Sequence, residues 1–232
     1  MAPVVLLRAA VATTGRFPAL AGVDLELGQG EVVVLEGANG AGKTSVLRAC
    51  AGLLPLSAGE ATVLGHDLRR DAAAVRRAVG LLGHSPALYD DLTVAENLRF
   101  SLRAAGAPAA GRAELLGLLE RTGLGGRVAA TAAGRLSAGQ RRRLGLAVVV
   151  GRAPMLWLLD EPHAGLDAEG RTLLEGVLAE ALAAGASALV ASHEPEVVVP
   201  LADRVLTMGG GRVVRSRRGG RRRVLAGGAH VA

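Results

Sequence analysis

The stretch Gly37-Ala38-Asn39-Gly40-Ala41-Gly42-Lys43-Thr44 constrains the fold more than any other part of the chain. It fits the P-loop pattern G-x-x-x-x-G-K-[ST] and is followed by Ser45. An apolar run at 32–35 precedes it, and a helical pattern at 45–50 follows. Glycines let backbone N–H groups approach a phosphate chain, and a helix N-terminus adds a favourable dipole. Strand, glycine loop and helix in this order predict an α/β fold that binds a nucleoside triphosphate.

Two residues of this loop have specific predicted roles. Lys43 supplies a compact positive charge for the terminal phosphates, and Thr44 can offer its hydroxyl to Mg²⁺. Lys43 is the only lysine among 27 cationic residues. A slim ammonium and a wide planar guanidinium are not interchangeable inside a phosphate loop, which explains a lysine in a chain otherwise rich in arginine. The alternative, a chance glycine-rich turn, is disfavoured by the strand and helix patterns on either side.

Length and composition set further limits. The 232 residues suit one α/β domain with room for an inserted subdomain. Hydrophobic residues make up 50% and aromatic residues 2%, so the core must consist mainly of Leu, Val and Ala. The single cysteine, Cys50, excludes an intrachain disulfide and is predicted to be a small buried apolar residue. We expect no transmembrane helix, no signal peptide and a cytoplasmic location, because the apolar runs are too short for either segment.

The formal charge of +6 is unevenly distributed. The main body is close to neutral, which argues against a whole-surface nucleic-acid binder. The excess lies among glycines near the C-terminus, in Arg212, Arg215, Arg217, Arg218, Arg221, Arg222 and Arg223. Such a tail could contact nucleic acid, contact anionic lipid headgroups, or be a solvated disordered end.

Hydrophobic periodicity predicts a mainly parallel sheet with helices between its strands. We expect antiparallel strands within 3–35, and later strands at 61–65, 79–82, 155–159, 187–191 and 204–208, the last of the chain. Helices are expected at 71–78, 113–122, 168–184 and 194–202. Thr93 and Glu96 form a predicted capping box at the start of a helical stretch. We therefore predict a core lobe at about 1–84 and 151–214, an inserted helical lobe at about 85–150, and a basic Gly/Arg tail at 215–232.

Two adjacent carboxylates end the apolar run that begins at Met155. Asp160, at the predicted strand end, is placed to hold Mg²⁺ through its water shell. Glu161 can orient or deprotonate an attacking water. The alternative is a strand that ends in an acidic turn, which the upstream P-loop disfavours.

A second helix start lies within the stretch Leu136-Ser137-Ala138-Gly139-Gln140, which is followed by Arg141-Arg142-Arg143. Ser137 is the predicted N-cap, and the free N–H groups of such a helix start form a phosphate site. Taken alone, this stretch would by default be interpreted as an ordinary capped helix.

Together these motifs resemble the nucleotide-binding domain of ATP-binding cassette (ABC) proteins over about residues 4–214. Leu136 to Gln140 is similar to the family signature, and Leu156 to Pro162 to its Walker B strand with the catalytic glutamate. Ala164 to Asp167 resembles the D-loop, and Ser192-His193 the switch histidine. Five motifs in order make this resemblance highly specific.

The resemblance implies a two-lobed P-loop ATPase with a mainly parallel core sheet, an antiparallel β-subdomain and an inserted α-helical subdomain. It implies ATP and Mg²⁺ as ligands and a head-to-tail homodimer. In that dimer the signature residues Ser137, Ala138, Gly139 and Gln140 would cap the nucleotide of the partner copy. Glu161 would polarise water, His193 would contact the γ-phosphate and Asp167 would couple the two sites.

Two positions depart from the family pattern. His84 occupies the place of the glutamine that usually joins the two lobes, so we assign it a coupling role and consider it as a Mg²⁺ ligand beside Thr44 and Asp160. The position that usually stacks on adenine corresponds to Thr14, and Phe17 is the nearest aromatic substitute.

Within the family, the stretches 82–100, 156–162 and Ser192-His193-Glu194-Pro195 resemble the ATP-binding subunit of the haem exporter used in cytochrome c maturation. This implies a separate integral-membrane subunit, docking in the groove beside 84–97, and a peripheral position on the cytoplasmic face of the membrane. Nucleic acid is not expected as a partner. The alternatives are another exporter ATPase, for drugs or lipids, and a soluble ABC ATPase acting on nucleic acid or ribosomes.

Overall fold

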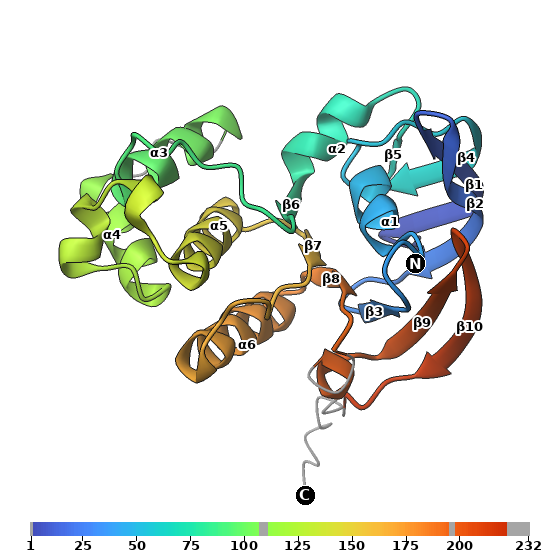
Figure 1. Ribbon diagram of the computed structural model, residues 1–232. Helices are drawn as coiled ribbons and strands as arrows, with labels where there is room; N and C mark the ends of the chain where they lie inside the picture. The colour runs from blue at the N-terminus through green and yellow to red at the C-terminus, as the bar shows by residue number, and fades with distance from the viewer. Residues whose placement is uncertain (1, 107–110, 195–197, 222–232) are drawn as a thin grey trace, which may run out of the picture.

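The computed structural model describes residues 2–106, 111–194 and 198–221, and its elements form two sheets and a group of helices (Figure 1). The strands of the larger sheet are β3 (Val32–Glu36), β6 (Val79–Leu82), β7 (Leu156–Asp160), β8 (Ser187–Ala191), β9 (Arg204–Gly209) and β10 (Arg212–Arg218). Their order is β10-β9-β3-β8-β7-β6, and all neighbours pair in parallel except β9 and β10. The expected mainly parallel core sheet is thus confirmed.

The smaller sheet is antiparallel. It contains β1 (Val5–Thr14), β2 (Phe17–Leu27), β4 (Ala58–Val63) and β5 (His66–Asp67), in the order β2-β1-β4-β5. The prediction of antiparallel strands within 3–35 holds for β1 and β2 but is wrong for β3. That strand is apolar from Val32 to Leu35 because it lies inside the larger sheet, where it pairs in parallel with β8 and β9.

The helices come between these strands. They are α1 (Lys43–Cys50), α2 (Ala72–Ala78), α3 (Val94–Ala104), α4 (Arg112–Arg121), α5 (Ala138–Arg152) and α6 (Ala168–Ala183), with 3₁₀ turns η1 (Gly126–Ala130), η2 (Ala133–Arg135) and η3 (Val199–Leu201). The helix expected at 194–202 is described only in part. Val198 is helical and η3 follows it, whereas residues 195–197, including Pro195, lie outside the described residues.

The larger sheet separates two apolar cores, and β3 contributes to both. Val33 and Leu35 pack with α1 and the smaller sheet, whereas Val32 and Val34 pack with α6 on the opposite face. This alternation fixes the register of β3, because a shift of one residue would exchange the two faces. Cys50 is fully buried in the first core, as predicted, and burial raises the pKa of its thiol to about 12.

The helices α3, α4 and α5 gather on one side of the molecule, away from the smaller sheet (Figure 1). They enclose a third apolar cluster of their own. The predicted capping box at α3 is confirmed: Thr93 accepts the N–H of Glu96, and the Glu96 carboxylate accepts the N–H of Thr93. The lobe boundaries given above stay a prediction.

The C-terminal arginines differ from the expectation of a tail that starts at residue 215. Residues 212–218 form β10 at the edge of the larger sheet, so β9 is not the last strand. Arg217 forms an ion pair with Glu36 at 2.8 Å, and Arg221 forms one with Asp203 at 3.0 Å. The rest of the predicted tail, 222–232, lies outside the described residues. None of the described helices has the length and apolar character that a membrane crossing needs.

Candidate functional site

The glycine loop connects the carboxyl end of β3 to the start of α1. Gly37 has φ of 139° and Gly42 has φ of 108°, in the region that favours glycine. A Cβ atom at Gly37 would lie 2.4 Å from the backbone oxygen of Met208, which leaves no space for a side chain. The loop therefore owes its close approach to β9 to the glycine at this position.

Lys43 is buried at the start of α1, and its Nζ donates to the backbone oxygens of Gly37 at 2.7 Å and Ala38 at 3.2 Å. Among the described residues no side chain caps this helix. The first N–H groups of α1 and a buried ammonium thus meet at one place. This donor set fits a polyphosphate.

Thr44 lies against the first of the two predicted carboxylates. Its Oγ1 donates to Asp160 Oδ1 at 3.2 Å and to Oδ2 at 3.0 Å. Burial raises the pKa of the Asp160 carboxyl, and the Thr44 hydrogen bond acts in the opposite direction. A hydroxyl and a buried carboxylate are hard oxygen ligands that fit Mg²⁺. The described residues hold no cluster of three His, Cys, Asp or Glu side chains suited to a metal, so phosphate oxygens and water would have to complete such a site.

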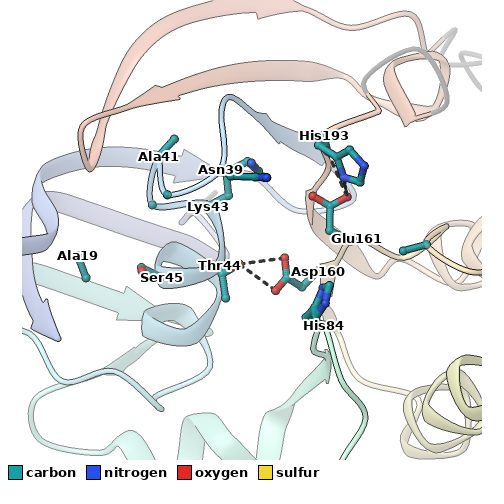
Figure 2. A pocket seen from close by; sticks show the side chains of 13 residues that line it. Ala19, Asn39, Ala41, Lys43, Thr44, Ser45, His84, Asp160, Glu161 and His193 are labelled. Carbon is teal, nitrogen blue, oxygen red and sulfur yellow. Dashed lines mark hydrogen bonds and ion pairs between the residues drawn. The ribbon is translucent and has the colours of Figure 1, made fainter. Parts of the chain in front are cut away.

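Glu161 and His193 form a pair at the carboxyl ends of β7 and β8. Nδ1 of His193 lies 2.7 Å from Glu161 Oε2, which also accepts the His193 backbone N–H at 3.1 Å. Glu161 has φ of 50°, which is strained for a residue with a side chain. Figure 2 shows the two side chains directed toward one another beside Asp160.

These groups line one cavity of about 350 Å³. His84 also lines it and lies next to Asp160 (Figure 2). Its lining residues are Ala19, Asn39, Gly40, Ala41, Gly42, Lys43, Thr44, Ser45, His84, Asp160, Glu161, Ala164 and His193. Phe17, the aromatic substitute, is 79% exposed at the start of β2 and is not among them, whereas Ala19 of the same strand is.

The signature residues lie outside that cavity. Ser137 caps α5: its Oγ accepts the N–H of Gln140 at 3.2 Å, and Gln140 Oε1 accepts the N–H of Ser137 at 3.0 Å. Asp167 caps α6, with Oδ1 accepting the N–H of Gly170 at 2.8 Å and the Arg143 guanidinium at 2.6 Å. The Gly170 N–H and Arg143 lower the pKa of this carboxyl. One chain therefore brings together the P-loop, both carboxylates and both histidines, but not the signature.

Sequence reasoning missed one residue near the site, Arg142. It is buried, and its guanidinium donates to backbone oxygens that include those of Gly83 and of the cavity residue Asp160. The only signal was the arginine triplet that follows the signature, since backbone acceptors leave no trace in the side-chain pattern.

The sequence matches the ABC transporter family over residues 20–164. The chain belongs to the ABC transporter family. It is 47% identical over 171 residues to the "Cytochrome c biogenesis ATP-binding export protein CcmA" of Bordetella bronchiseptica. The matched stretch covers 74% of this chain and 75% of the relative. It is also 40% identical over 208 residues to the "Sulfate/thiosulfate import ATP-binding protein CysA" of Caulobacter vibrioides, covering 86% and 60%.

Structural similarity agrees with this assignment. A dimeric ATP-binding cassette solved with ADP and phosphate superposes with a TM-score of 0.84 at 24% identity, covering 92% of this chain and 98% of that one. The expected fold class, the family and the ATPase class of this ABC chain are confirmed. The roles of the single site residues stay predictions.

Proposed function

We propose that this protein is the ATP-hydrolysing subunit of an exporter that moves haem through a separate membrane subunit during cytochrome c maturation. The observation that carries the ATPase part is the convergence of Lys43, Thr44 with Asp160, and Glu161 with His193 on one cavity. The cargo rests on the 47% identity to a cytochrome c biogenesis export protein.

Each side chain has a distinct proposed task in the cavity. Lys43 and the uncapped N-terminus of α1 bind the β- and γ-phosphates of ATP. Glu161 orients the attacking water and accepts its proton, and His193 holds the carboxylate in place while its ring contacts the γ-phosphate. Thr44 and Asp160 would hold Mg²⁺, which when bound would supply positive charge near the phosphates. His84 borders the Asp160 carboxylate and links this end of the sheet to the helical lobe.

The site is completed by a second copy of the chain. Ser137 and Gly139 at the start of α5 lie outside the cavity, so within one chain they contribute nothing to phosphate binding. A head-to-tail homodimer would bring the α5 N-terminus of one copy to the nucleotide of the other. The dimeric solved relative supports this arrangement.

A groove of about 930 Å³ between α2, α3 and the 83–89 loop is the proposed docking place of the membrane subunit. Tyr89 and Phe100 meet edge to face at 4.8 Å in it, and both are about half exposed. Its described lining residues include Arg76, Arg77 and Arg152 and no carboxylate. We expect a cytoplasmic helix with apolar and acidic side chains as the occupant, which places the protein on the cytoplasmic face of the membrane. Contact of the arginines near the C-terminus with lipid headgroups remains part of this proposal.

The second candidate is the ATPase subunit of a sulfate or thiosulfate importer. The 40% identity to such a subunit favours it, although that relative is longer than this chain. The two candidates share the ATPase site and differ only in the membrane subunit and the cargo.

The ATPase assignment is tested with Glu161→Gln. We expect turnover to fall about 10²- to 10⁴-fold, the range for loss of a general base. We also expect ATP to hold the variant as a dimer in gel filtration, because binding is retained. Glu60→Gln, an exposed carboxylate on the smaller sheet, is the matched control and should leave turnover unchanged. Wild-type turnover by Glu161→Gln would contradict the assignment.

The cargo is tested in a bacterium that lacks its own copy of the cytochrome c biogenesis ATPase. The wild-type chain should restore c-type cytochromes with attached haem and co-purify with the membrane subunit, whereas Glu161→Gln should co-purify without restoring them. A chain that hydrolyses ATP but restores no cytochrome would refute the cargo and leave the ATPase assignment standing.

A further inference from the structure

Arg142 lies on the first turns of α5 and is only 4% exposed. Its guanidinium touches backbone oxygens rather than a carboxylate. Nε donates to Pro162 at 3.5 Å, Nη1 donates to Gly83 at 2.7 Å and His84 at 2.8 Å, and Nη2 donates to Asp160 and Glu161.

The count of donors equals the count of acceptors. A guanidinium has five N–H donors in a fixed plane, and here each of the five meets a carbonyl. The five carbonyls lie at or just after the carboxyl ends of β6 and β7. These strands are parallel neighbours, so their carboxyl ends lie side by side. Lysine has only three donors around a single point and cannot satisfy this set.

The peptide units held in this way carry the side chains of the cavity. His84, Asp160 and Glu161 all line it, and Arg142 binds the backbone oxygen of each. Glu161 is the strained residue of the three, with φ of 50°. Such a conformation persists only where its surroundings fix it. The carbonyls before and after the Glu161 Cα atom are both fixed by Nη2.

We propose that Arg142 is a positioning residue that holds Glu161 in its reactive orientation and ties it to the signature helix. The same helix, α5, begins at the Ser137 cap. A single helix therefore carries the signature at its N-terminus and, about one turn further on, Arg142, which binds the backbone at the end of β7. A shift of α5 on engaging a second copy therefore moves the Glu161 backbone. This inference rests on the proposed roles of Glu161 and Ser137.

The neighbouring arginines show that this task belongs to Arg142 alone among the triplet. Arg141 pairs with Asp90 at 2.8 Å, and Arg143 pairs with Asp167 at 2.6 Å. Both partners are largely exposed carboxylates, whereas Arg142 is buried and its acceptors are backbone oxygens. Burial lowers the pKa of Arg142, but an arginine stays charged at every pH at which the fold is stable.

The test compares Arg142→Lys and Arg142→Gln with the wild-type chain by kcat, KM, affinity for a fluorescent ATP analogue and melting temperature. Arg204→Lys is the matched control. Its guanidinium also bridges several acceptors, Glu31 and the Glu26 carbonyl, but at the amino end of β9, remote from the cavity.

We expect kcat to fall about 10-fold in Arg142→Lys and about 100-fold in Arg142→Gln, because misplacement by about 1 Å costs on the order of 100-fold. Analogue affinity should stay within about threefold, since the P-loop and α1 are untouched. The control should keep wild-type turnover. Adding Arg142→Lys to Glu161→Gln should cause no further loss, because both changes act on one group.

Three results would overturn the proposal: an Arg142→Gln variant within about twofold of wild-type kcat, a loss of analogue affinity as large as the loss of kcat, or additive losses in the double variant. If Arg142→Gln does not fold, Arg142→Lys decides by the same criteria. A wild-type chain without turnover would instead refute the proposed function, and the role of Arg142 with it.

Discussion

The N-termini of α1 and α5 are both predicted to face a phosphate, yet they differ in how their own N–H groups are satisfied. At α1 the described residues offer no side-chain cap, and Gly42 precedes the helix. At α5, Ser137 and Gln140 close a complete capping box. The first helix start has no side-chain cap within one chain, whereas at the second the N–H groups of Ser137 and Gln140 are bound by each other's side chains.

The difference indicates which end needs a second copy. An open N-terminus beside a buried lysine binds anions without rearrangement. Ser137 Oγ accepts the N–H of Gln140, and its O–H can at the same time donate to a phosphate, so the cap is kept when the signature engages. Because Ser137 lies outside the cavity of its own chain, the signature should engage a nucleotide only when a second copy brings it there.

The largest effect in this comparison is expected from removing the Lys43 ammonium at the uncapped N-terminus of α1. In Lys43→Met the stem packs as before but the ammonium is lost, so we expect affinity for a fluorescent ATP analogue to fall on the order of 100-fold. Titration of the purified variant measures this, with the melting temperature as a check on folding. Affinity within about threefold of wild type would show that α1 and its loop suffice without the lysine.

A smaller effect, on turnover rather than on affinity, is expected at the capped N-terminus of α5. Ser137→Ala should leave analogue affinity of the isolated chain unchanged and lower turnover about 10-fold, which corresponds to about 1.4 kcal/mol. Steady-state kinetics at saturating ATP measure it. Equal losses of affinity and turnover would place Ser137 at the nucleotide of its own chain.

Mixing the two variants gives the control. In a head-to-tail dimer, one site would combine Lys43 of the Ser137→Ala chain with Ser137 of the Lys43→Met chain and be intact. Turnover of the mixture should therefore exceed that of either variant alone. A mixture no more active than the average of its parts would contradict the shared site.

The smallest effect is expected from Gln140→Ala, which removes half of the capping box. We expect the free energy of unfolding to fall by about 0.5 to 1 kcal/mol with analogue affinity unchanged. Urea unfolding measures this change. Gln29→Ala, at an exposed turn, is the control and should stay within about 0.5 kcal/mol of wild type.

The sequence predicted those parts of the molecule whose physical cause is local. The Thr93 and Glu96 capping box and the strand that ends at Asp160 follow from short-range patterns, and both were found. The glycine loop likewise had few conformations open to it. The P-loop, Asp160 and Glu161 meet because parallel strands end at one edge of a sheet.

The parts that were missed depend on distant partners. Residues 212–218 have the composition of a disordered tail, but as an edge strand they pair with β9, and Arg217 reaches Glu36. Arginine on an exposed edge also discourages pairing with other chains. The hydrogen bonds of Arg142 could not be predicted from the sequence, because their acceptors are backbone oxygens, which every residue type provides.

The place of β3 in the sheet has a consequence for how the protein is made. The strand that leads into the glycine loop is synthesised early, but its two neighbours are residues 188–191 and 204–207. Until the ribosome has released them, four consecutive apolar residues present two unpaired edges, and such long-range pairing forms slowly. A chain that ends before residue 207 should therefore be recognised by chaperones or proteases, because it cannot complete the sheet on both sides of β3.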